Sequence, residues 1–278
     1  MFTEENVSPE FAAKIETSEV NAWVDMYAAM PPDFAGQFEL GITQVQNVVL
    51  TRCKKIPFVH FNCVKNLGMN EPASESLVDE VISIYREAGV RNFTFYHIPH
   101  SQPSALPEWL KARGFRPRGG WDRIYRNGDA FTNPAVELGD HFRVEKVTQT
   151  TGAEWAGYID SVYGLPTTPW LLSLVERQGW HHYMLRKDEK IVAVRTMYVH
   201  SDGMAWLGVE APVPGLMAPS FDLDMQLCQT IVKDGIDMGV RYFVADIEAP
   251  TPEMNTPAYH NFEALGFKRI YFRSHYSA

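Results

Sequence analysis

Apolar residues recur along the chain with helical and strand-like periods in a repeated order. In the second half, residues 221–239 (FDLDMQLCQTIVKDGIDMG) have helical spacing and end at a glycine, and residues 242–247 (YFVADI) follow as an apolar strand. Residues 76–89 and 92–98 show the same order in the first half. A proline-rich loop, a short helix ending in Gly-Phe and a last strand follow each time. The last strands are WDRIYR (121–126) and RIYFRSHY (269–276).

The two halves also match residue by residue, which indicates an internal repeat. The segment AGVRNF, from Ala88, matches MGVRYF, which begins 150 residues later at Met238. A second match follows in order at an offset of 152 residues, where ARGF from Ala112 aligns with ALGF from Ala264. Two matches in the same order predict two copies of one module.

A strand meander completes the second module. Residues 183–213 alternate between apolar and polar and turn near Lys187–Lys190 and Ser201–Gly203, which predicts three antiparallel strands. An opening strand is predicted at 141–147 and a helix at 152–164. The first half is fainter, with candidate strands at 39–53 and 56–64. The polar stretch 126–140 is the predicted linker, so we expect domains at 1–138 and 139–278.

Composition narrows the class of protein. The chain of 278 residues is 45% apolar and 21% charged, which is ordinary for a globular protein of one or two domains. The net charge of −9 argues against nucleic acid or an anionic membrane as a partner and favours a small cationic or amine-bearing substrate. We expect a monomer or a homodimer.

Cysteine usage and the N-terminal sequence suggest the compartment. Three cysteines occur without a CxxC pair or histidines at zinc-binding spacing, so we predict no metal site. The N-terminal residues lack a basic start and an apolar run, and no stretch approaches about 18 uninterrupted apolar residues. These features predict a reduced, cytoplasmic protein.

Several of these segments resemble the GNAT superfamily of N-acyltransferases. The hairpin DEKIVAVRTMYV, the strand AWLGVEAPV and the predicted element order carry the resemblance, together with a late motif at the superfamily's NxxAxxxYxxxGF spacing. The residues at that spacing are Asn255, Ala258, Phe262, Gly266 and Phe267. The resemblance implies an α/β fold of tandem GNAT-like domains, each a mixed, mostly antiparallel sheet with splayed central strands flanked by helices. The N-terminal domain is the degenerate copy.

The resemblance also implies a cofactor, acetyl-CoA or another acyl-CoA, bound where the fourth and fifth strands of a domain splay apart. The pantetheine arm would add to the exposed strand edge, and the pyrophosphate would bind at the N-terminus of the following helix. Carried onto this chain, the cofactor-binding residues are Gly208, Val209, Ala211, Asn255 and Phe262.

Two positions depart from the superfamily's pattern. Asp222 and Asp224 stand where glycines of the pyrophosphate signature R/QxxGxG/A are expected, and carboxylates there would repel a phosphate. An alternative is a helix start capped by Ser220. Phe262 stands where members often carry a tyrosine that protonates the leaving thiolate. Tyr259, three residues earlier on the same helix, can substitute for it or be an ordinary half-buried helix residue.

Carboxylates lie at the predicted ends of the splayed strands. Glu210 ends one strand, and Asp246 and Glu248 alternate on the next. Converging carboxylates would bind an ammonium group, and Glu210 would take its proton as general base. We therefore interpret Asp246 and Glu248 as substrate-binding residues, and we add Trp206 as a residue that lines the acceptor pocket. The alternative for Trp206 is an ordinary core residue. The alternative is that the carboxylates point to solvent at strand ends.

The leading functional hypothesis is an N-acyltransferase that moves an acyl group, chiefly acetyl, from acyl-CoA to an amine of a small molecule. The second hypothesis is a GNAT-fold protein that has lost CoA binding. Such a protein would act as a ligand-binding or regulatory module, or as an enzyme with different chemistry in the same cleft.

Overall fold

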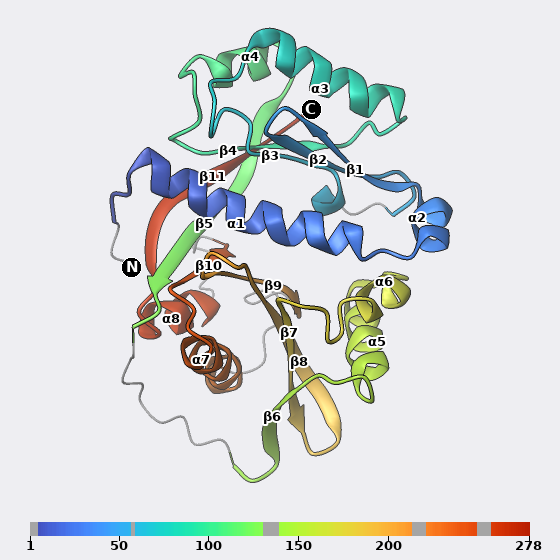
Figure 1. The fold of residues 1–278 in the computed structure, drawn as a ribbon, viewed down its shortest axis with the longest axis vertical. Helices are drawn as coiled ribbons and strands as arrows, with labels where there is room; N and C mark the ends of the chain where they lie inside the picture. Colours follow the sequence, from blue (N-terminus) through green and yellow to red (C-terminus); the bar gives the residue numbers. More distant parts are fainter. Residues whose placement is uncertain (1–4, 57–58, 130–138, 213–220, 249–256) are drawn as a thin grey trace. The chain divides into compact units, whose positions relative to one another are not determined.

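The computed structural model describes residues 5–56, 59–129, 139–212, 221–248 and 257–278. The chain forms two compact units (Figure 1). Unit 1 comprises Met1–Glu5 and Asp122–Ile270, and unit 2 comprises Asn6–Trp121 and Tyr271–Ala278. The domain boundary predicted near residue 138 falls outside the described ranges and stays a prediction. Within these ranges, no helix is long and apolar enough to cross a lipid bilayer.

Unit 1 is built on a mixed sheet, and its elements confirm the meander and the helices predicted for the second half. They are β5 (Arg116–Asn127), β6 (Phe142–Lys146), α5 (Gly152–Tyr163), α6 (Thr168–Leu172), β7 (Trp180–Lys187), β8 (Lys190–Val199), β9 (Met204–Ala211), α7 (Phe221–Asp237), β10 (Tyr242–Ile247), α8 (Pro257–Ala264) and β11 (Lys268–Ser277). Residues 116–121 of β5 and 271–277 of β11 belong to unit 2. The strand order is β5-β10-β9-β8-β7-β6, with β9 and β10 parallel and the other neighbours antiparallel.

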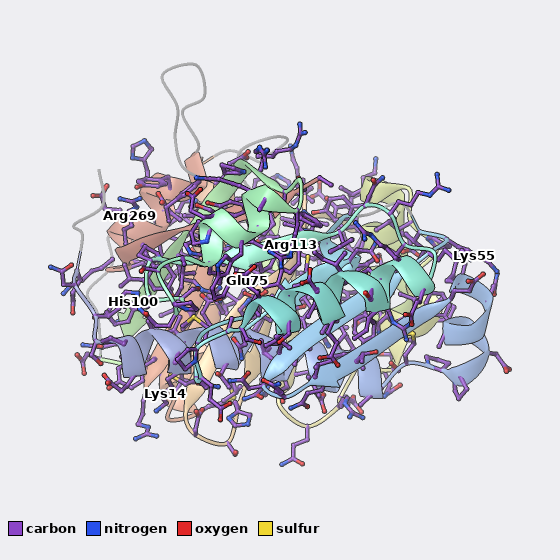
Figure 2. All side chains as sticks on the ribbon, turned by 90° about the horizontal axis from the view of Figure 1, so that it is seen from above. Lys14, Lys55, Glu75, His100, Arg113 and Arg269 are labelled. Atoms are coloured by element: carbon purple, nitrogen blue, oxygen red, sulfur yellow. The ribbon has the colours of Figure 1, made fainter. Side chains whose placement is uncertain are left out.

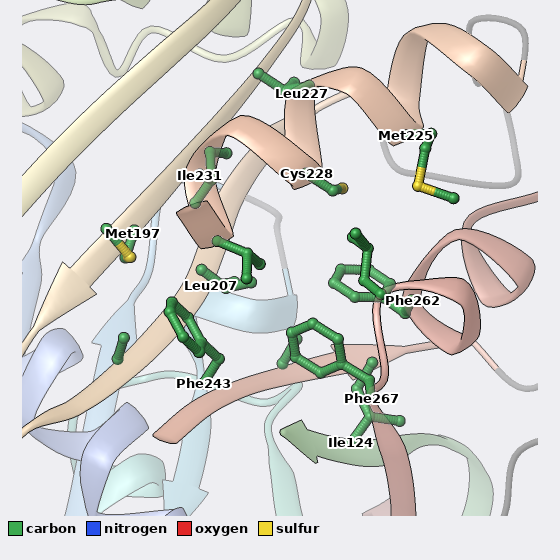
Figure 3. Close-up of a cluster of buried hydrophobic side chains, with 14 of the residues drawn as sticks. Ile124, Met197, Leu207, Met225, Leu227, Cys228, Ile231, Phe243, Phe262 and Phe267 are labelled. Carbon is green, nitrogen blue, oxygen red and sulfur yellow. The ribbon is translucent and has the colours of Figure 1, made fainter. Parts of the chain in front are cut away.

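The core of unit 1 lies between the sheet and the pair α7 and α8, while α5 and α6 cover the other face (Figure 1). Figure 3 shows Leu207 of β9 and Phe243 of β10 packed under Ile231 and Cys228 of α7, with Phe262 of α8 beside them. Burying each large apolar side chain contributes about 1.5–3 kcal/mol, so this layer is the main source of the unit's stability.

Unit 2 repeats the arrangement with shorter central strands and a longer first helix. They are α1 (Pro9–Ala28), α2 (Pro32–Phe38), β1 (Leu40–Val45), β2 (Val48–Cys53), a 3-10 turn (Val59–Phe61), β3 (Cys63–Lys65), α3 (Glu75–Glu87), β4 (Thr94–His97) and α4 (Leu106–Ala112). The strand order is β1-β2-β3-β4-β11-β5, and β3 and β4 are the parallel pair. Apolar side chains of α3 and α4 pack on β2, β3 and β4. Arg113, just after α4, binds Glu75 of α3 at 3.2 Å and Asp79 at 2.5 Å (Figure 2).

Two expectations for the first half were wrong or incomplete. Residues 56–64 were predicted to be a strand, but the described part forms a 3-10 turn and only the start of the short strand β3. The long helix α1 was not predicted. Its start carries a recognisable signal, because Ser8 accepts a hydrogen bond from the backbone N–H of Phe11 at 3.2 Å and Pro9 follows it.

A buried ionic network joins α1 to the sheet of unit 2. Arg273 of β11 lies 3.2 Å from Glu16 and 2.5 Å from Glu19, and Lys65 of β3 lies 2.6 Å from Glu19. The Tyr271 hydroxyl donates to Glu16 at 2.9 Å. The two acidic and two basic side chains are all buried, so the charges compensate one another inside the unit.

The last strands of the two repeats are exchanged. β5 ends the first repeat but pairs with β10, where Arg123 lies opposite Asp246. β11 ends the second repeat but pairs with β4, where His275 lies opposite Tyr96. Tyr96 and Asp246 are 150 residues apart, and Arg123 and His275 are 152 apart, the two offsets found in the sequence. The repeat is therefore structural as well as sequential, with its final strands exchanged.

Candidate active site

The parallel strands β9 and β10 separate before either ends. Their paired positions run from Met204 with Tyr242 to Leu207 with Ala245, while β9 continues to Ala211. The backbone of the last four residues of β9 is thus unpaired with β10. This is the splay that the resemblance implies.

A β-bulge lies on β9 at the same point. Thr196 of β8 pairs with Gly208 of β9, and the next pair is Val194 with Ala211. One residue of β8 therefore lies between these pairs, against two residues of β9. Arg195 is therefore opposite two residues, Val209 and Glu210. Val209 has a φ of 46°, a left-handed conformation that is rare and costly for a β-branched residue.

The bulge decides where the Glu210 side chain points. Side chains alternate along a strand, so without the extra residue Glu210 would leave the sheet on the face opposite Leu207. The bulge returns Glu210 to the face of Leu207 and Arg195. There the Glu210 Oε2 atom lies 3.1 Å from the Arg195 Nη2 atom. The Arg195 side chain is 1% exposed and that of Glu210 is 27% exposed, so Glu210 is the more exposed member of a largely buried pair.

Two further side chains fix the arginine from α7 and α8. The Asp224 Oδ1 atom lies 3.4 Å from Arg195 Nη2, and the Asn261 amide donates to the other Asp224 oxygen. Arg195 also contacts the Cys228 sulfur, and its guanidinium lies 5.1 Å from the centre of the Phe262 ring. Asp224 therefore points into the sheet rather than at a ligand beyond the helix end, which differs from the expectation that its charge repels a pyrophosphate. The Asp222 side chain lies outside the described residues.

The electrostatic environment of Glu210 combines opposing effects. Burial raises the pKa of Glu210, the positive charge of Arg195 lowers it, and the negative charges of Asp224 and Asp246 raise it, so that the net direction is upward. Burial raises the pKa of the Cys228 thiol well above its ordinary value, which keeps it a neutral thiol. From α5, the Tyr163 hydroxyl donates to the backbone carbonyl of Glu210. A carboxyl group with a raised pKa beside an exposed strand end can serve as a general base.

The other predicted carboxylates are placed differently from one another. Asp246 acts electrostatically on Glu210, but it also lies 3.0 Å from the buried Arg123 of β5. Glu248 follows the last residue of β10 and is partly buried. The structure thus brings two of the three predicted carboxylates near each other, each with an arginine beside it.

Tyr259 and Phe262 are both buried in α8. The Tyr259 hydroxyl donates to Asp122 at 3.5 Å, and Asp122 lies 2.7 Å from Arg269. Phe262 packs edge-on against Phe267 at 4.8 Å between ring centres. The position that carries a proton-donating tyrosine in the superfamily is thus an apolar part of the core.

The remaining predicted residues that the structure describes belong to β9. Gly208 must be a glycine, because a Cβ atom there would lie 2.2 Å from the Trp206 ring. Trp206 is buried, as is Ala211, while Val209 forms the bulge. Asn255 lies outside the described residues. Sequence reasoning missed Arg195, Asn261 and Tyr163, although a charged residue in the apolar run IVAVRTMYV was a signal for Arg195.

Unit 2 contains the same positions without the polar network. Val64 of β3 pairs with Phe95 of β4, and Leu207 of β9 pairs with Ala245 of β10. Phe95 and Ala245 are equivalent at the repeat offset of 150 residues, so Val64 and Leu207 are equivalent as well. From this pair of equivalent residues, each member of the network in unit 1 can be assigned an apolar or small counterpart in unit 2. The strand registers align Arg195 with Val48 and Glu210 with Leu67, and the sequence offset of 150 residues aligns Asp224 with Ser74 and Cys228 with Val78. Ser74 is the N-cap of α3, whereas Asp224 lies inside the first turn of α7. Val48, Leu67 and Val78 belong to the apolar core of unit 2.

The splay of unit 2 is also closed by the chain itself. The backbone N–H of Gln102, beyond β4, donates to the carbonyl of Gly68, beyond β3, at 2.7 Å. The carbonyl of Gln102 in turn accepts from Ala73 at 2.8 Å. A Cβ atom on Gly68, which has a φ of 74°, would lie 2.2 Å from the Gln102 oxygen. The two segments leaving the parallel strands of unit 2 are in direct backbone contact.

Comparison with known proteins identifies the fold. No protein-family profile matches the chain, and no curated protein sequence matches it. The structure is similar to a GCN5-related N-acetyltransferase from Kribbella flavida, with a TM-score of 0.59, 13% identity, and coverage of 96% of this chain and 95% of that one. A GCN5-related N-acetyltransferase from Sphaerobacter thermophilus gives a TM-score of 0.58, 14% identity, and coverage of 100% and 95%.

The tandem arrangement has its own counterpart. A tandem GNAT protein from the clavulanic acid biosynthesis pathway gives a TM-score of 0.57, 13% identity, and coverage of 100% of this chain and 98% of that one. The predicted fold class is confirmed: this chain has the GNAT fold in its tandem form.

Proposed function

We propose that unit 1 is an N-acyltransferase that moves an acyl group, chiefly acetyl, from acyl-CoA to the amine of a small molecule. The observation that carries the proposal is the buried network behind the partly exposed Glu210 side chain at the end of a splayed strand. Burying ions costs free energy, and unit 2 forms the same layer with apolar residues. The fold does not require the network, which favours a chemical role.

The described residues fit an acyl-CoA at the splay. The unpaired backbone of Gly208 to Ala211 faces the gap, where the amides of a pantetheine arm can hydrogen-bond as an added strand. The absence of a side chain at Gly208 keeps that backbone accessible. The superfamily's pyrophosphate position, at the start of the helix after the splay, lies outside the described residues, because 213–220 and the side chains of 221–223 are not described.

Bound acyl-CoA would supply the activated acyl group as a thioester. The Glu210 carboxylate takes a proton from the acceptor amine as its nitrogen forms the new C–N bond and the C–S bond breaks. Backbone N–H groups of Val209 to Ala211 would polarise the acyl carbonyl. Tyr259 is our candidate for protonating the leaving sulfur. Asp246 would attract the cationic form of the acceptor, which loses one proton to solvent before its neutral nitrogen attacks the thioester.

One cofactor per chain is expected. The counterpart of Glu210 in unit 2 is Leu67, which cannot act as a base, and the backbone of unit 2 bridges the gap between Gly68 and Gln102. Isothermal titration with acetyl-CoA should therefore show about one site per chain, and two sites would contradict this assignment of the units.

The activity is tested with acetyl-CoA and a panel of primary amines, following free thiol release. Glu210→Gln keeps size and hydrogen bonding but removes the base, so it should bind acetyl-CoA normally and lose about 100-fold or more in kcat. Glu189→Gln, the same substitution at an exposed position in the turn between β7 and β8, is the matched control for this charge change elsewhere. No heat with millimolar acetyl-CoA would overturn the proposal.

A ligand-binding module without transfer is the second candidate. The buried Phe262 favours it, because a phenylalanine cannot protonate a leaving thiolate. Acetyl-CoA binding by the wild type, without thiol release on any amine of the panel, would support this candidate against the enzyme.

A further inference from the structure

We propose that Arg195 is a positioning residue for Glu210, holding its carboxylate at the end of the splayed strand and keeping it ionised for proton transfer. This inference rests on the proposed function of unit 1. The positioning role itself is a statement about two side chains, and it can be tested without turnover.

Arg195 is suited to this role because its guanidinium is held on several sides. Asp224 lies 3.4 Å from Nη2, and the Asn261 amide fixes the other oxygen of Asp224. The Phe262 ring lies 5.1 Å from the guanidinium carbon, a distance at which a ring face attracts a cation. A guanidinium fixed in this way cannot swing to follow Glu210. Glu210 must instead adopt the conformation that meets it at 3.1 Å.

The bulge makes the contact possible. Arg195 is opposite both Val209 and Glu210, and the left-handed conformation of Val209 turns Glu210 onto the arginine's face. A left-handed conformation at a β-branched residue costs about 1–2 kcal/mol, so the surrounding structure must compensate for it. The Arg195 to Glu210 ion pair is a contact that only the bulged strand can make.

The charges around Glu210 make Arg195 decisive for its protonation. Asp224 and Cys228 face it from α7, Asp246 from β10 and Tyr163 from α5. Burial and the two aspartates favour the protonated carboxyl, whereas Arg195 favours the carboxylate. With Arg195 removed, every remaining effect is in the direction of protonation.

The test compares Arg195→Met with Arg195→Lys, which keeps the charge but loses the planar fork. Carbon-13 NMR of labelled glutamate, assigned with Glu210→Gln, follows the titration of Glu210. In Arg195→Met its midpoint should rise by roughly one pH unit or more, and in Arg195→Lys by less. In Arg195→Met, the apparent pKa of the acid limb in the pH dependence of kcat should rise by the same amount, and kcat at neutral pH should fall about tenfold. The affinity for acetyl-CoA should stay within about twofold of the wild type.

A second variant guards against misfolding. The double variant Arg195→Val, Asp224→Ser removes one positive and one negative charge from unit 1. It introduces the residue types that unit 2 has at Val48 and Ser74, so it should fold while Glu210 still loses its cation. Because Asp224 itself raises the pKa of Glu210, the double variant is compared with Asp224→Ser alone. A Glu210 midpoint that is no higher in the double variant than in Asp224→Ser, or no higher in folded Arg195→Met than in the wild type, overturns the positioning role. A wild type that neither binds acetyl-CoA nor transfers acyl groups overturns the proposed function instead, and the NMR titration still decides the role of Arg195.

Discussion

Leu67 of unit 2 and Glu210 of unit 1 occupy the same place in the two repeats, each three residues beyond the last pair of the parallel strands. Leu67 is buried in an apolar core, whereas Glu210 is paired with a buried arginine and is partly accessible. The chain thus contains its own control for what this position requires structurally. An apolar residue is sufficient for the fold.

The first prediction exchanges the network of unit 1 for its counterparts in unit 2. The triple variant Arg195→Val, Glu210→Leu and Asp224→Ser should fold, with a free energy of unfolding between unchanged and about 4 kcal/mol higher, because it replaces buried ions by well-packed side chains. It should have no acyltransferase activity. Urea unfolding followed by circular dichroism measures the first outcome and thiol release the second.

The single variant Arg195→Val is its control. It leaves Glu210 and Asp224 without their counter-ion, so it should lose about 3–5 kcal/mol of stability. If the triple variant proves less stable than the single one, the network is structural and the comparison between the repeats misleads.

The repeat was predictable because glycines and apolar residues carry it. Gly89 and Gly239 end helices with a positive φ, and such positions strongly restrict the residue type. The matches at these positions gave the offsets that the strand registers confirm. The exchange of β5 and β11 was not predictable, because both strands have the same alternation of apolar and polar residues. Tertiary packing therefore decides which neighbour each strand pairs with.

The network was only partly predictable for a related reason. Glu210 follows from its place at a strand end, but Arg195 becomes its partner only through the bulge, and the sequence around Val209 does not announce one. Asp224 was correctly placed in the first turn of α7. Its direction was missed because helix spacing alone does not tell which side faces the sheet.

The second prediction concerns the strained residue of the bulge. Val209→Gly relieves the cost of a left-handed β-branched residue, about 1–2 kcal/mol, and adds an entropic cost of about 0.5–1 kcal/mol. Stability should therefore stay equal or rise by about 1 kcal/mol. Val209→Ala keeps a Cβ atom and serves as the control. A loss above about 1 kcal/mol in the glycine variant would mean that the valine side chain, rather than the backbone shape, matters here.

The third prediction isolates the role of the Tyr259 hydroxyl. Its hydrogen bond to Asp122 is long, at 3.5 Å, and Asp122 keeps Arg269 at 2.7 Å when the hydroxyl is removed. Tyr259→Phe should therefore change the free energy of unfolding by no more than about 1 kcal/mol. A kcat loss of about tenfold or more, with unchanged affinity for acetyl-CoA, would support proton donation by this hydroxyl. Full activity would remove Tyr259 from the site.

The fourth prediction concerns the pH dependence of stability at a histidine of unit 1. His182 is 3% exposed, and its Nε2 atom lies 3.0 Å from the Leu174 carbonyl. Because a carbonyl only accepts, Nε2 carries the proton, and Nδ1 accepts from the Thr196 hydroxyl at 2.8 Å. Burial lowers the pKa of His182 from 6.5 to about 4, against a smaller opposing effect of the Leu174 hydrogen bond. The neutral ring is thus the form that the folded state stabilises.

The sign of the effect follows from linkage. A depressed histidine pKa contributes stability that is fully present above about 6.5 and is lost as the pH falls towards about 4, because the unfolded chain binds the proton first. His182→Gln keeps a donor for Leu174 and removes the titration. Between about pH 7.5 and about pH 5, the melting temperature of this variant should fall by roughly 4–8 °C less than that of the wild type. His60→Gln in unit 2, where burial also lowers the histidine pKa to about 4, is the matched comparison. Equal losses in His182→Gln and the wild type would show that His182 is already protonated in the folded protein at about pH 5, or that water reaches it.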